Sequence, residues 1–599
     1  MTTHDNPTNP ATRPFAAALP IGAVTLGGWL GQRYELTWRG NLLALNWDDD
    51  FLRPFQEKKS EAGFYVGMGK TFEGLTRFAA HTQDQQLLAL RRHVLDTLLP
   101  SQDPDGYLGT YLPEVRISRL WDVHELAYIL FALVSDWRLF GEAASLNAAK
   151  RLGNHLLERL GGIPLPTEYN PGTESDLAFE LTMLGLDRAF LALHRATGDV
   201  RYLEFCLHRL DLETWNLPIV EGRHGRLEGH AYAYLCRCLA QIDLRETLGN
   251  DGLLAQTHGV VDYLSARGGL LVNGAFSMSE CWHSDQNGAG ELGETCATAY
   301  WIRLCARLLC IEGSGRYGDL IERAIYNALF AAQSPDGRRL RYYVPFAGPR
   351  VYWDRDTYCC PGNFRRILAE LPEIVCFTTD SGFFVNLYTP CKARILLASG
   401  SAIELIQETD YPNSGSVALR LTMTKPERFT VSLRILAWCV DYALSVGGQS
   451  IEVPVKDGFV HIKREWQGGE SIGLEMKMAW RLVRGQSLQD GRAALLRGPV
   501  LFCVNPKRNE IAFTDLPAFE LDLPESRMPD EDSTLRPGGM SCSYRRGQSK
   551  GPLVFTEFAD PDGEAIYFPP ATGTSPTGDE LLTSFGSIRE ASLLYWWKL

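Results

Sequence analysis

Two short stretches of the chain carry residue types that could bind a metal ion. Residues 293–296 read Gly-Glu-Thr-Cys, and residues 358–363 read Tyr-Cys-Cys-Pro-Gly-Asn. One carboxylate and three thiols match the four ligands of a closed tetrahedral zinc site, and soft sulfur donors favour zinc over magnesium or calcium. The candidate ligands are Glu294, Cys296, Cys359 and Cys360. The spacing is not that of a zinc finger, and two clusters of ordinary buried cysteines are the alternative.

The composition narrows the classes of partner and compartment. The 599 residues are long enough for two to four domains. The net charge of −13 provides no basic surface for nucleic acid or an anionic membrane. The 14 cysteines show no disulfide-framework spacing. Because an oxidising compartment would endanger a metal–thiolate site, we expect the protein in reduced cytoplasm.

The uncharged stretch 14–31 has some features of a secretory signal peptide. However, it contains two prolines and four glycines, and Asp5 as well as Arg13 precedes it. We therefore expect this stretch to belong to the folded chain. Elsewhere, no span of about 18 residues is apolar enough to cross a bilayer.

Helical periodicity dominates from about residue 71 to residue 374. Apolar residues recur at i, i+3, i+4 and i+7. The helical segments are 71–81, 84–98, 123–140, 142–160, 176–197, 202–214, 229–248, 252–267, 295–310 and 318–332. Helices joined as consecutive hairpins fit an (α/α)6 barrel with a pocket at one end. A helical solenoid would give the same signal, although no repeat of fixed period is visible.

The period changes to two after about residue 382, which predicts strands. They are 384–388, 417–422, 430–435, 459–462 and 472–476, then 493–504 as one strand, a few strands among long loops in 526–583, and a last strand at 592–597. Short strands separated by turns are typical of a β-sandwich. The predicted fold is mainly α with C-terminal β. An (α/α)6-barrel domain spans 1–380, a β-sandwich domain 381–490 and a second β-rich domain 491–599.

The two cysteine-bearing motifs resemble the signature of glycoside hydrolase family 127, whose founding activity is β-L-arabinofuranosidase. Gly-Glu-Thr-Cys-Ala and Cys-Cys-Pro-x-Asn carry the resemblance, which runs nearly end to end and includes residues 105–108 and 496–499. It implies a helical barrel followed by β-sandwich domains. It also implies a zinc ion (Zn2+) held by the four candidate ligands, with Cys359 also attacking the anomeric carbon.

The resemblance places the proton donor shortly before the first motif. The match is Glu280, at 294 − 280 = 14 residues before Glu294. The loop 281–293 departs from the family's aromatic and acidic pattern, so Asp285 and Glu291 are competing carboxylates. A thiolate nucleophile and a carboxylic acid would together make a retaining glycosidase.

Substrate contacts follow from other matching motifs. The resemblance implies that His124, His230 and Glu322 hydrogen-bond sugar hydroxyls, and Tyr343 matches a family aromatic with one residue of slack. Residues 174–180 lack a second histidine that the family places there. The sugar is therefore L-arabinofuranose, a different furanose, or a sugar that carries a carboxylate.

The sequence thus predicts a zinc-dependent, retaining exo-glycosidase that releases L-arabinofuranose or a related furanose from β-linked glycosides. One alternative is a sugar epimerase or polysaccharide lyase, in which His and Tyr move protons and the cysteines are structural. Another is a non-catalytic carbohydrate-binding protein with a structural zinc. We expect a small oligosaccharide or glycoside as partner and leave a homodimer open.

Overall fold

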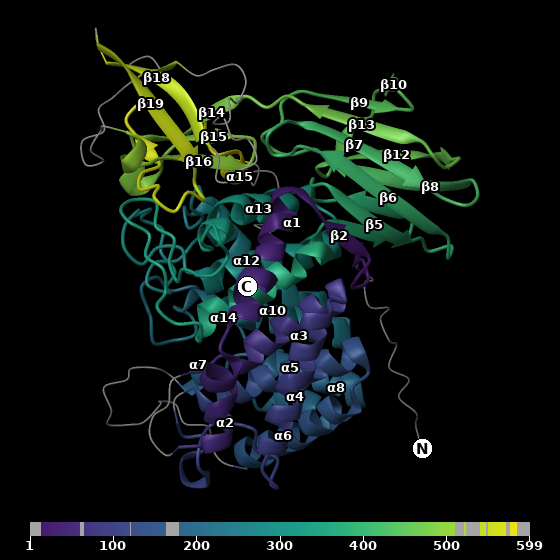
Figure 1. Ribbon diagram of the computed structural model, residues 1–599, viewed down its shortest axis with the longest axis vertical. Coiled ribbons are helices and arrows are strands. Elements are labelled where there is room, and N and C mark those ends of the chain that lie inside the picture. Colours follow the sequence, from purple (N-terminus) through teal and green to yellow (C-terminus); the bar gives the residue numbers. More distant parts are fainter. Residues whose placement is uncertain are drawn as a thin grey trace, which may run out of the picture.

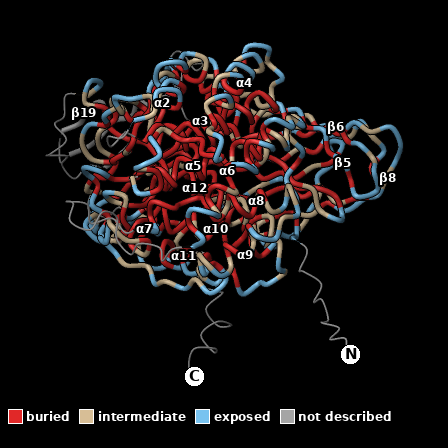
Figure 2. The backbone as a smooth tube through the Cα atoms, turned by 90° about the horizontal axis from the view of Figure 1, so that it is seen from below, coloured by how far each residue is buried: buried red, intermediate tan, exposed pale blue. Residues whose placement is uncertain are grey.

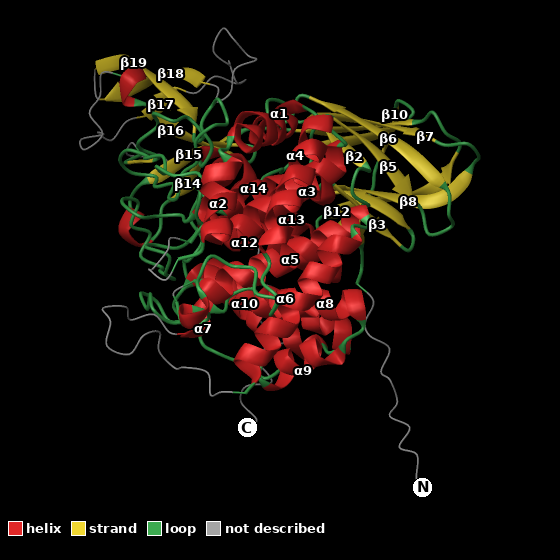
Figure 3. Ribbon diagram, turned by 60° about the horizontal axis from the view of Figure 1, so that its bottom comes forward, coloured by secondary structure: helices red, strands yellow, loops and turns green. Residues whose placement is uncertain are grey.

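The computed structural model describes residues 14–59, 65–119, 121–162, 179–509, 520–522, 539–546, 549–570 and 575–583. Helices make up the N-terminal part of the described chain and strands most of the C-terminal part (Figure 3). The strands form two regions that lie over one end of the helical part (Figure 1). None of the helices in the described ranges has both the length and the apolar character needed to cross a bilayer.

Six helices form an inner ring in the helical part. Each contacts the next, and the last contacts the first, so the ring is closed. In order around the ring they are α3 (Met68–Thr82), α5 (Asp122–Phe140), α8 (Leu186–Thr197), α10 (Ala231–Leu248), α12 (Thr295–Glu312) and α14 (Cys359–Glu370). Most of their residues are buried (Figure 2), as expected of helices at the centre of a domain.

A second layer of helices covers this ring. Its members are α1 (Gly28–Leu36), α4 (Gln85–Leu98), α6 (Ala143–Gly161), α9 (Val200–His208), α11 (Ala255–Ala266) and α13 (Gly315–Ala324). They pack against α14, α3, α5, α8, α10 and α12 respectively. The predicted fold class is confirmed: the described helices have the arrangement of an (α/α)6 barrel, and the closed ring excludes an open solenoid.

The helices differ from the sequence prediction at several places. Helix α1 was not predicted, and α9 ends at His208 rather than at residue 214. The predicted helix 176–197 is interrupted before α8, because Gly185 has a left-handed backbone with φ of 88°. Helix α14 was not among the predicted helices. The remaining short helices are α2 (Arg53–Glu57), α7 (Phe179–Thr182) and α15 (Glu580–Thr583).

Two sheets form the first β region. One has the strand order β1-β3-β4-β8-β12-β11 and the other β10-β9-β13-β7-β6-β5-β2. The strands are β1 (Ala17–Ala18), β2 (Val24–Leu26), β3 (Cys376–Thr379), β4 (Gly382–Val385), β5 (Cys391–Leu396), β6 (Ala402–Thr409), β7 (Ser416–Thr422), β8 (Glu427–Arg434), β9 (Tyr442–Val446), β10 (Gln449–Ile451), β11 (Val455–Lys456), β12 (Phe459–Trp466) and β13 (Ser471–Met476). Buried and exposed residues alternate along β5 and β7, because only one face of each strand is covered.

The N-terminal stretch 14–31 takes part in both sheets. β1 pairs with β3, and β2 pairs with β5. Helix α1 then begins at Gly28. The expectation that this stretch belongs to the folded chain is confirmed for these residues, which tie the start of the barrel to the first β region.

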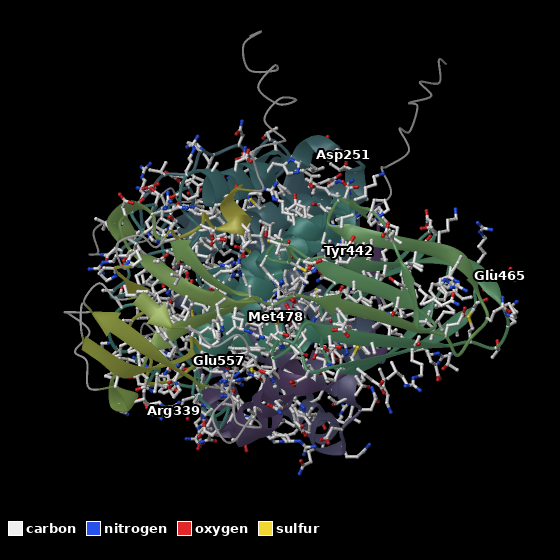
Figure 4. The ribbon with its side chains drawn as sticks, turned by 90° about the horizontal axis from the view of Figure 1, so that it is seen from above. Asp251, Arg339, Tyr442, Glu465, Met478 and Glu557 are labelled. Atoms are coloured by element: carbon white, nitrogen blue, oxygen red, sulfur yellow. The ribbon has the colours of Figure 1, made fainter. Side chains whose placement is uncertain are left out.

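A third sheet forms the second β region, with the order β14-β15-β16-β19-β18-β17, and β20 pairs with β15. Its strands are β14 (Trp480–Arg484), β15 (Ala493–Arg497), β16 (Val500–Val504), β17 (Glu520–Asp522), β18 (Gly539–Arg546), β19 (Ser549–Glu557) and β20 (Tyr567–Phe568). Met478, between β13 and β14, lies where the two β regions meet (Figure 4). The division into three domains stays a prediction, and the expected strand 592–597 lies outside the described residues.

The expected single strand 493–504 is wrong. It is a hairpin of β15 and β16, in which Arg497 pairs with Val500. The turn needs a left-handed residue, and Gly498 supplies it with φ of 55°. The apolar pattern continues on both sides of the turn, so it did not reveal the break.

Candidate functional site

The four predicted metal ligands lie in the first turns of two neighbouring inner helices. Glu294 is the N-cap of α12 and Cys296 is its second residue, while Cys359 and Cys360 are the first two residues of α14. One ligand atom from each lies within 4.8 Å of all the others. The contact between α12 and α14 therefore brings together two motifs that are far apart in sequence.

The geometry of this group fits a zinc ion. Cys360 Sγ is 3.2 Å from Cys296 Sγ and 3.7 Å from Glu294 Oε1. Tetrahedral zinc with bonds near 2.3 Å would place neighbouring sulfur ligands about 3.8 Å apart. The second oxygen of Glu294 is buried and has no hydrogen-bond partner among the described residues. A cation bound here would supply the missing partner, since a buried carboxylate oxygen is costly to leave alone.

The four groups differ in acidity. Burial raises the pKa of the Glu294 carboxyl and of the Cys296 and Cys360 thiols well above their ordinary values. Burial acts on Cys359 in the same direction, but hydrogen bonds from the Cys296 and Cys360 thiols outweigh it and hold the pKa of Cys359 well below the usual thiol value. Its position at a helix N-terminus also favours a thiolate. Cys359 is therefore the first thiol of the group to ionise.

The backbone on both sides of the site is strained. Tyr358, the N-cap of α14, has φ of 108°, and Glu280 has φ of 65°, both unusual for residues other than glycine. Gly67 permits the close approach to Tyr358, because a Cβ there would lie 2.9 Å from the Tyr358 carbonyl oxygen. Backbone strain of this kind gathers at functional sites, where the surrounding structure holds it in place.

Tyr342 joins Glu280 to Cys359. Its hydroxyl donates a hydrogen bond to Glu280 Oε1 and lies 3.3 Å from Cys359 Sγ. His224 Nε2 and His230 Nε2 lie 3.1 Å and 3.3 Å from the other oxygen, Glu280 Oε2. The structure thus brings the predicted acid next to the predicted nucleophile, and it adds His224, which the sequence prediction did not include.

These hydrogen bonds set the charge of Glu280. Burial acts to raise its pKa, but the bonds from His224, His230 and Tyr342 outweigh it, and the pKa of Glu280 lies below its usual range. The hydrogen bond to this carboxylate in turn raises the pKa of His224. The carboxylate and the His224 imidazole therefore hold protons as one coupled group.

A small cavity opens over Cys359. Its lining residues are Tyr65, Trp121, His124, Leu181, Leu184, His230, Tyr232, Glu280, Glu294, Tyr342, Tyr358 and Cys359. Aromatic walls with a few polar groups are typical of sites for small polar ligands such as sugars. Leu181 and Leu184 follow the region of the expected second histidine, most of which lies outside the described residues.

His124 lines the cavity with both ring nitrogens already engaged. Its Nδ1 lies 3.0 Å from the Leu184 carbonyl oxygen, and its Nε2 lies 3.2 Å from Lys70 Nζ. Since the carbonyl only accepts and the ammonium only donates, Nδ1 carries the proton and Nε2 accepts. Burial and the Lys70 charge hold the pKa of His124 well below its ordinary value, so the ring is neutral. In this arrangement His124 has no free nitrogen for a sugar hydroxyl.

Two predicted substrate residues lie elsewhere. The structure does not bring Glu322 to the cavity: it is buried on the outer helix α13 and pairs with Arg434 of β8 at 3.1 Å. Burial raises the pKa of Glu322 to about 7. Tyr343 is not a lining residue either, whereas its neighbour Tyr342 is. The sequence could not reveal where these two side chains lie, since both positions depend on how α13 and the chain after it pack.

Lys70 is a buried charge that the sequence prediction missed. Its side chain is fully buried in α3, and Nζ lies 3.0 Å from the Tyr232 hydroxyl. The ring centres of Tyr65, Tyr128 and Tyr232 are 5.3, 4.4 and 4.9 Å from Nζ. No described carboxylate forms an ion pair with it. The sequence offered no signal for this burial, because Lys70 lies just before the predicted helix 71–81 and lysine is almost never fully buried.

Comparison with known proteins gives a consistent result. The family description "Beta-L-arabinofuranosidase, GH127 catalytic domain" matches residues 17–373, and "Beta-L-arabinofuranosidase, GH127 middle domain" matches residues 382–478. A curated non-reducing end β-L-arabinofuranosidase of Bifidobacterium longum subsp. longum is 25% identical over 503 residues, which are 72% of this chain and 73% of the relative.

Two solved structures share the fold across nearly their whole length. A GH127 β-arabinofuranosidase superposes with a TM-score of 0.79 at 21% identity, covering 93% of this chain and 98% of the other. A GH127 β-L-arabinofuranosidase from Geobacillus stearothermophilus T6 superposes with a TM-score of 0.76 at 20% identity, covering 91% and 100%. At these identities the likeness shows the fold alone.

Proposed function

This chain belongs to glycoside hydrolase family 127, and we propose that it is a retaining exo-glycosidase releasing L-arabinofuranose or a related furanose from β-linked glycosides. The observation that carries the proposal is the bridge from Glu280 through the Tyr342 hydroxyl to Cys359. One hydroxyl between two groups keeps them within about 6 Å of each other. Retaining glycosidases hold their two reactive groups roughly 5 Å apart. The names of the relatives support the sugar.

We propose that Glu294, Cys296, Cys359 and Cys360 hold zinc. Their residue types, their mutual distances and the unpartnered Glu294 oxygen support this ligand set. When bound, zinc would keep the coordinating thiols deprotonated at neutral pH. The side chains of Glu294, Cys296 and Cys360 would stay in place while the Cys359 sulfur is free to react.

In the first step, the Cys359 thiolate attacks the anomeric carbon from below the sugar ring. The bond from that carbon to the leaving oxygen breaks, and its electron pair goes to that oxygen. The proton held by the group of Glu280 and His224 passes through the Glu280 carboxyl to the leaving oxygen. The sugar is then joined to Cys359 through a carbon–sulfur bond.

In the second step, Glu280 acts as a base. It takes a proton from a water molecule whose oxygen attacks the same carbon, and the carbon–sulfur bond breaks to return the Cys359 thiolate. Two inversions at one carbon give net retention. Tyr342 donates to Glu280 beside the reacting sulfur, so it orients the carboxyl towards the bond that changes.

A mechanism-based furanosyl inactivator tests this proposal. After incubation and proteolysis, one sugar mass is expected on the peptide that contains Cys359. Fragmentation that places the sugar on Glu280 or Cys360 would contradict the mechanism. An epimerase, a lyase or a binding protein would leave Cys359 unlabelled and release no aglycone from an aryl β-L-arabinofuranoside.

A further inference from the structure

The later turns of the inner helices surround a second cavity, apart from the proposed active site. Its volume is about 440 Å³, and its lining comes from α3, α5, α8, α10, α12 and α14, with β1 and β3 at one side. None of its lining residues lines the cavity over Cys359. The barrel thus holds two separate cavities.

Arginine dominates the charge of this second cavity. The lining guanidinium groups belong to Arg77, Arg138, Arg188, Arg195, Arg303, Arg307 and Arg366, and the lining carboxylates to Asp243, Glu246, Glu370 and Glu373. Glu73 adds a fifth carboxylate through its pairs with Arg77 and Arg366. Seven cations against five anions leave an excess of two positive charges (7 − 5), in a chain whose net charge is −13.

Ion pairs account for most of these arginines. Asp243 accepts from Arg188 at 2.8 Å and from Arg307 at 2.7 Å. The other pairs are Arg77 with Glu73 and Glu373, Arg366 with Glu73, and Arg195 with Glu246. Two arginines stand out from this network because their guanidinium groups are not fully used.

Arg303 is the buried member of these two. Only 7% of it is exposed, and its Nε donates to Glu370 at 2.7 Å. Its Nη1 and Nη2 atoms are buried with no hydrogen-bond partner among the described residues. The negative end of the α12 dipole does not account for it, because Arg303 lies nine residues before Glu312 (312 − 303) and the dipole acts within the last turn.

Arg138 is the exposed member. It lies in the last turn of α5, lines the cavity, and has no ion pair or hydrogen bond with any described residue. Its neighbour Trp137 and Phe131 line the same cavity. A guanidinium group binds carboxylate or phosphate oxygens in pairs, and an aromatic wall suits the apolar face of a sugar ring.

We propose that this cavity binds a small organic anion, of about monosaccharide size, whose carboxylate or phosphate group is held by Arg138 and Arg303. The excess of two positive charges in the cavity would balance the charge of a phosphate monoester, which is about −2. A sugar acid, with a charge of about −1, would need only one of them. The site goes beyond the proposed glycosidase function, which uses none of these residues.

Calorimetry on the full chain tests the proposal with four probes: glucose 6-phosphate, glucuronate, inorganic phosphate and neutral glucose. The anionic sugars are expected to bind and glucose is not. Tighter binding of glucose 6-phosphate than of glucuronate would assign the phosphate class, and the reverse order would assign the carboxylate class. If neither anionic sugar binds with a Kd below about 10 mM, or glucose binds as tightly, the proposal is wrong.

Two variants locate the binding. Arg303→Gln and Arg138→Ala should each weaken the binding of the anionic sugar by about tenfold or more, since each removes a charge-assisted contact. Arg39→Ala, which removes an exposed arginine paired with Glu35, serves as the control. Because Arg138 is exposed, its variant should fold even if the Arg303 variant does not. Unchanged affinity in Arg138→Ala and in a folded Arg303→Gln would overturn the proposed site.

Discussion

One cavity of the barrel lies at the first turns of inner helices and the other among their later turns, and the two carry different chemistry. Around the first turns lie thiols and carboxylates, among them Cys359, Cys360 and Glu294, whereas the later turns carry a cluster of arginines. Helix N-termini bear partial positive charge, which stabilises thiolates and carboxylates, and the C-termini favour cations. The direction of the inner helices therefore favours a thiolate at Cys359 and the cations of Arg138 and Arg195, which lie in the last turns of α5 and α8.

The two cavities also differ in how their charges are balanced. Most arginines of the second cavity have carboxylate partners. At the proposed active site, Glu294 has an unpartnered oxygen and Lys70 has no carboxylate partner among the described residues. Three thiolates and one carboxylate around a zinc ion would carry a net charge of about −2. Lys70 is then the buried cation that offsets part of it, as its lowering effect on the pKa of Cys359 indicates.

The largest effect is expected from Cys359→Ser. A hydroxyl is a much weaker nucleophile than a thiolate, so kcat should fall by about 10³-fold or more. Steady-state rates on an aryl β-L-arabinofuranoside, together with zinc content, measure it. Loss of activity with zinc retained would separate the nucleophile from a purely structural ligand.

Cys310→Ser is the matched control for that variant. Cys310 lies near the end of α12 and lines the second cavity, so its loss should leave kcat within about twofold. Two results would contradict the claim that only the cavity over Cys359 is catalytic. These are full activity in Cys359→Ser, or an equal loss of activity in both variants.

Glu280→Gln comes next. An amide cannot carry the proton to the leaving oxygen, so the rate on a poor leaving group should fall by about 10²–10⁴-fold. A nitrophenyl glycoside needs little protonation and should lose much less in the first step. Rates on a matched pair of alkyl and nitrophenyl furanosides test this. An equal loss of rate on both substrates would show that Glu280 is not the general acid.

The metal ligands of this site could be predicted because they stand in contiguous sequence motifs. Two short motifs contain all four ligands, namely Glu294, Cys296, Cys359 and Cys360. Such motifs can be read from the sequence without knowledge of the surrounding fold. The helix that begins at Cys359 was not predicted. Pro361 and Gly362 weaken the helical signal of its first turn, yet proline is tolerated there because the first backbone N–H groups of a helix have no intrahelical partner.

Residues that depend on packing were beyond the sequence. Glu322 stands in a matching motif, but its helix faces the first β region, so it meets Arg434. Lys70 and His224 reach the site from α3 and from a loop, and no spacing rule connects them to Glu280 or Cys359. The barrel was easier to predict, since its helices are long and strongly periodic.

Lys70→Met tests the balance of charge at the proposed active site. Methionine keeps an unbranched side chain of similar length but removes a positive charge near a centre of net negative charge, so zinc affinity should fall by about 10–100-fold. Competition with a chelator measures this without any assay of activity. Arg138→Met, which removes a cation from the second cavity, should leave zinc affinity unchanged. A lower melting temperature of the metal-free protein with unaltered zinc affinity would make Lys70 only a structural residue.

His224→Asn should have the smallest effect, a shift in the pH profile. The first step needs a proton on the group of Glu280 and His224, and the hydrogen bond between them raises the pKa of His224. Activity should therefore fall as the pH rises through the upper pKa of the group. Asparagine can still donate to Glu280 but cannot carry the proton. Glu280 must then hold it alone, and His230 and Tyr342 keep the pKa of Glu280 low. The alkaline limb of kcat/KM should move to lower pH by about one unit or more.

His258→Asn, at an exposed histidine that pairs with Glu312 at 2.7 Å, is the matched control and should leave the profile in place. An unmoved limb in His224→Asn would mean that the proton for the leaving group comes from elsewhere.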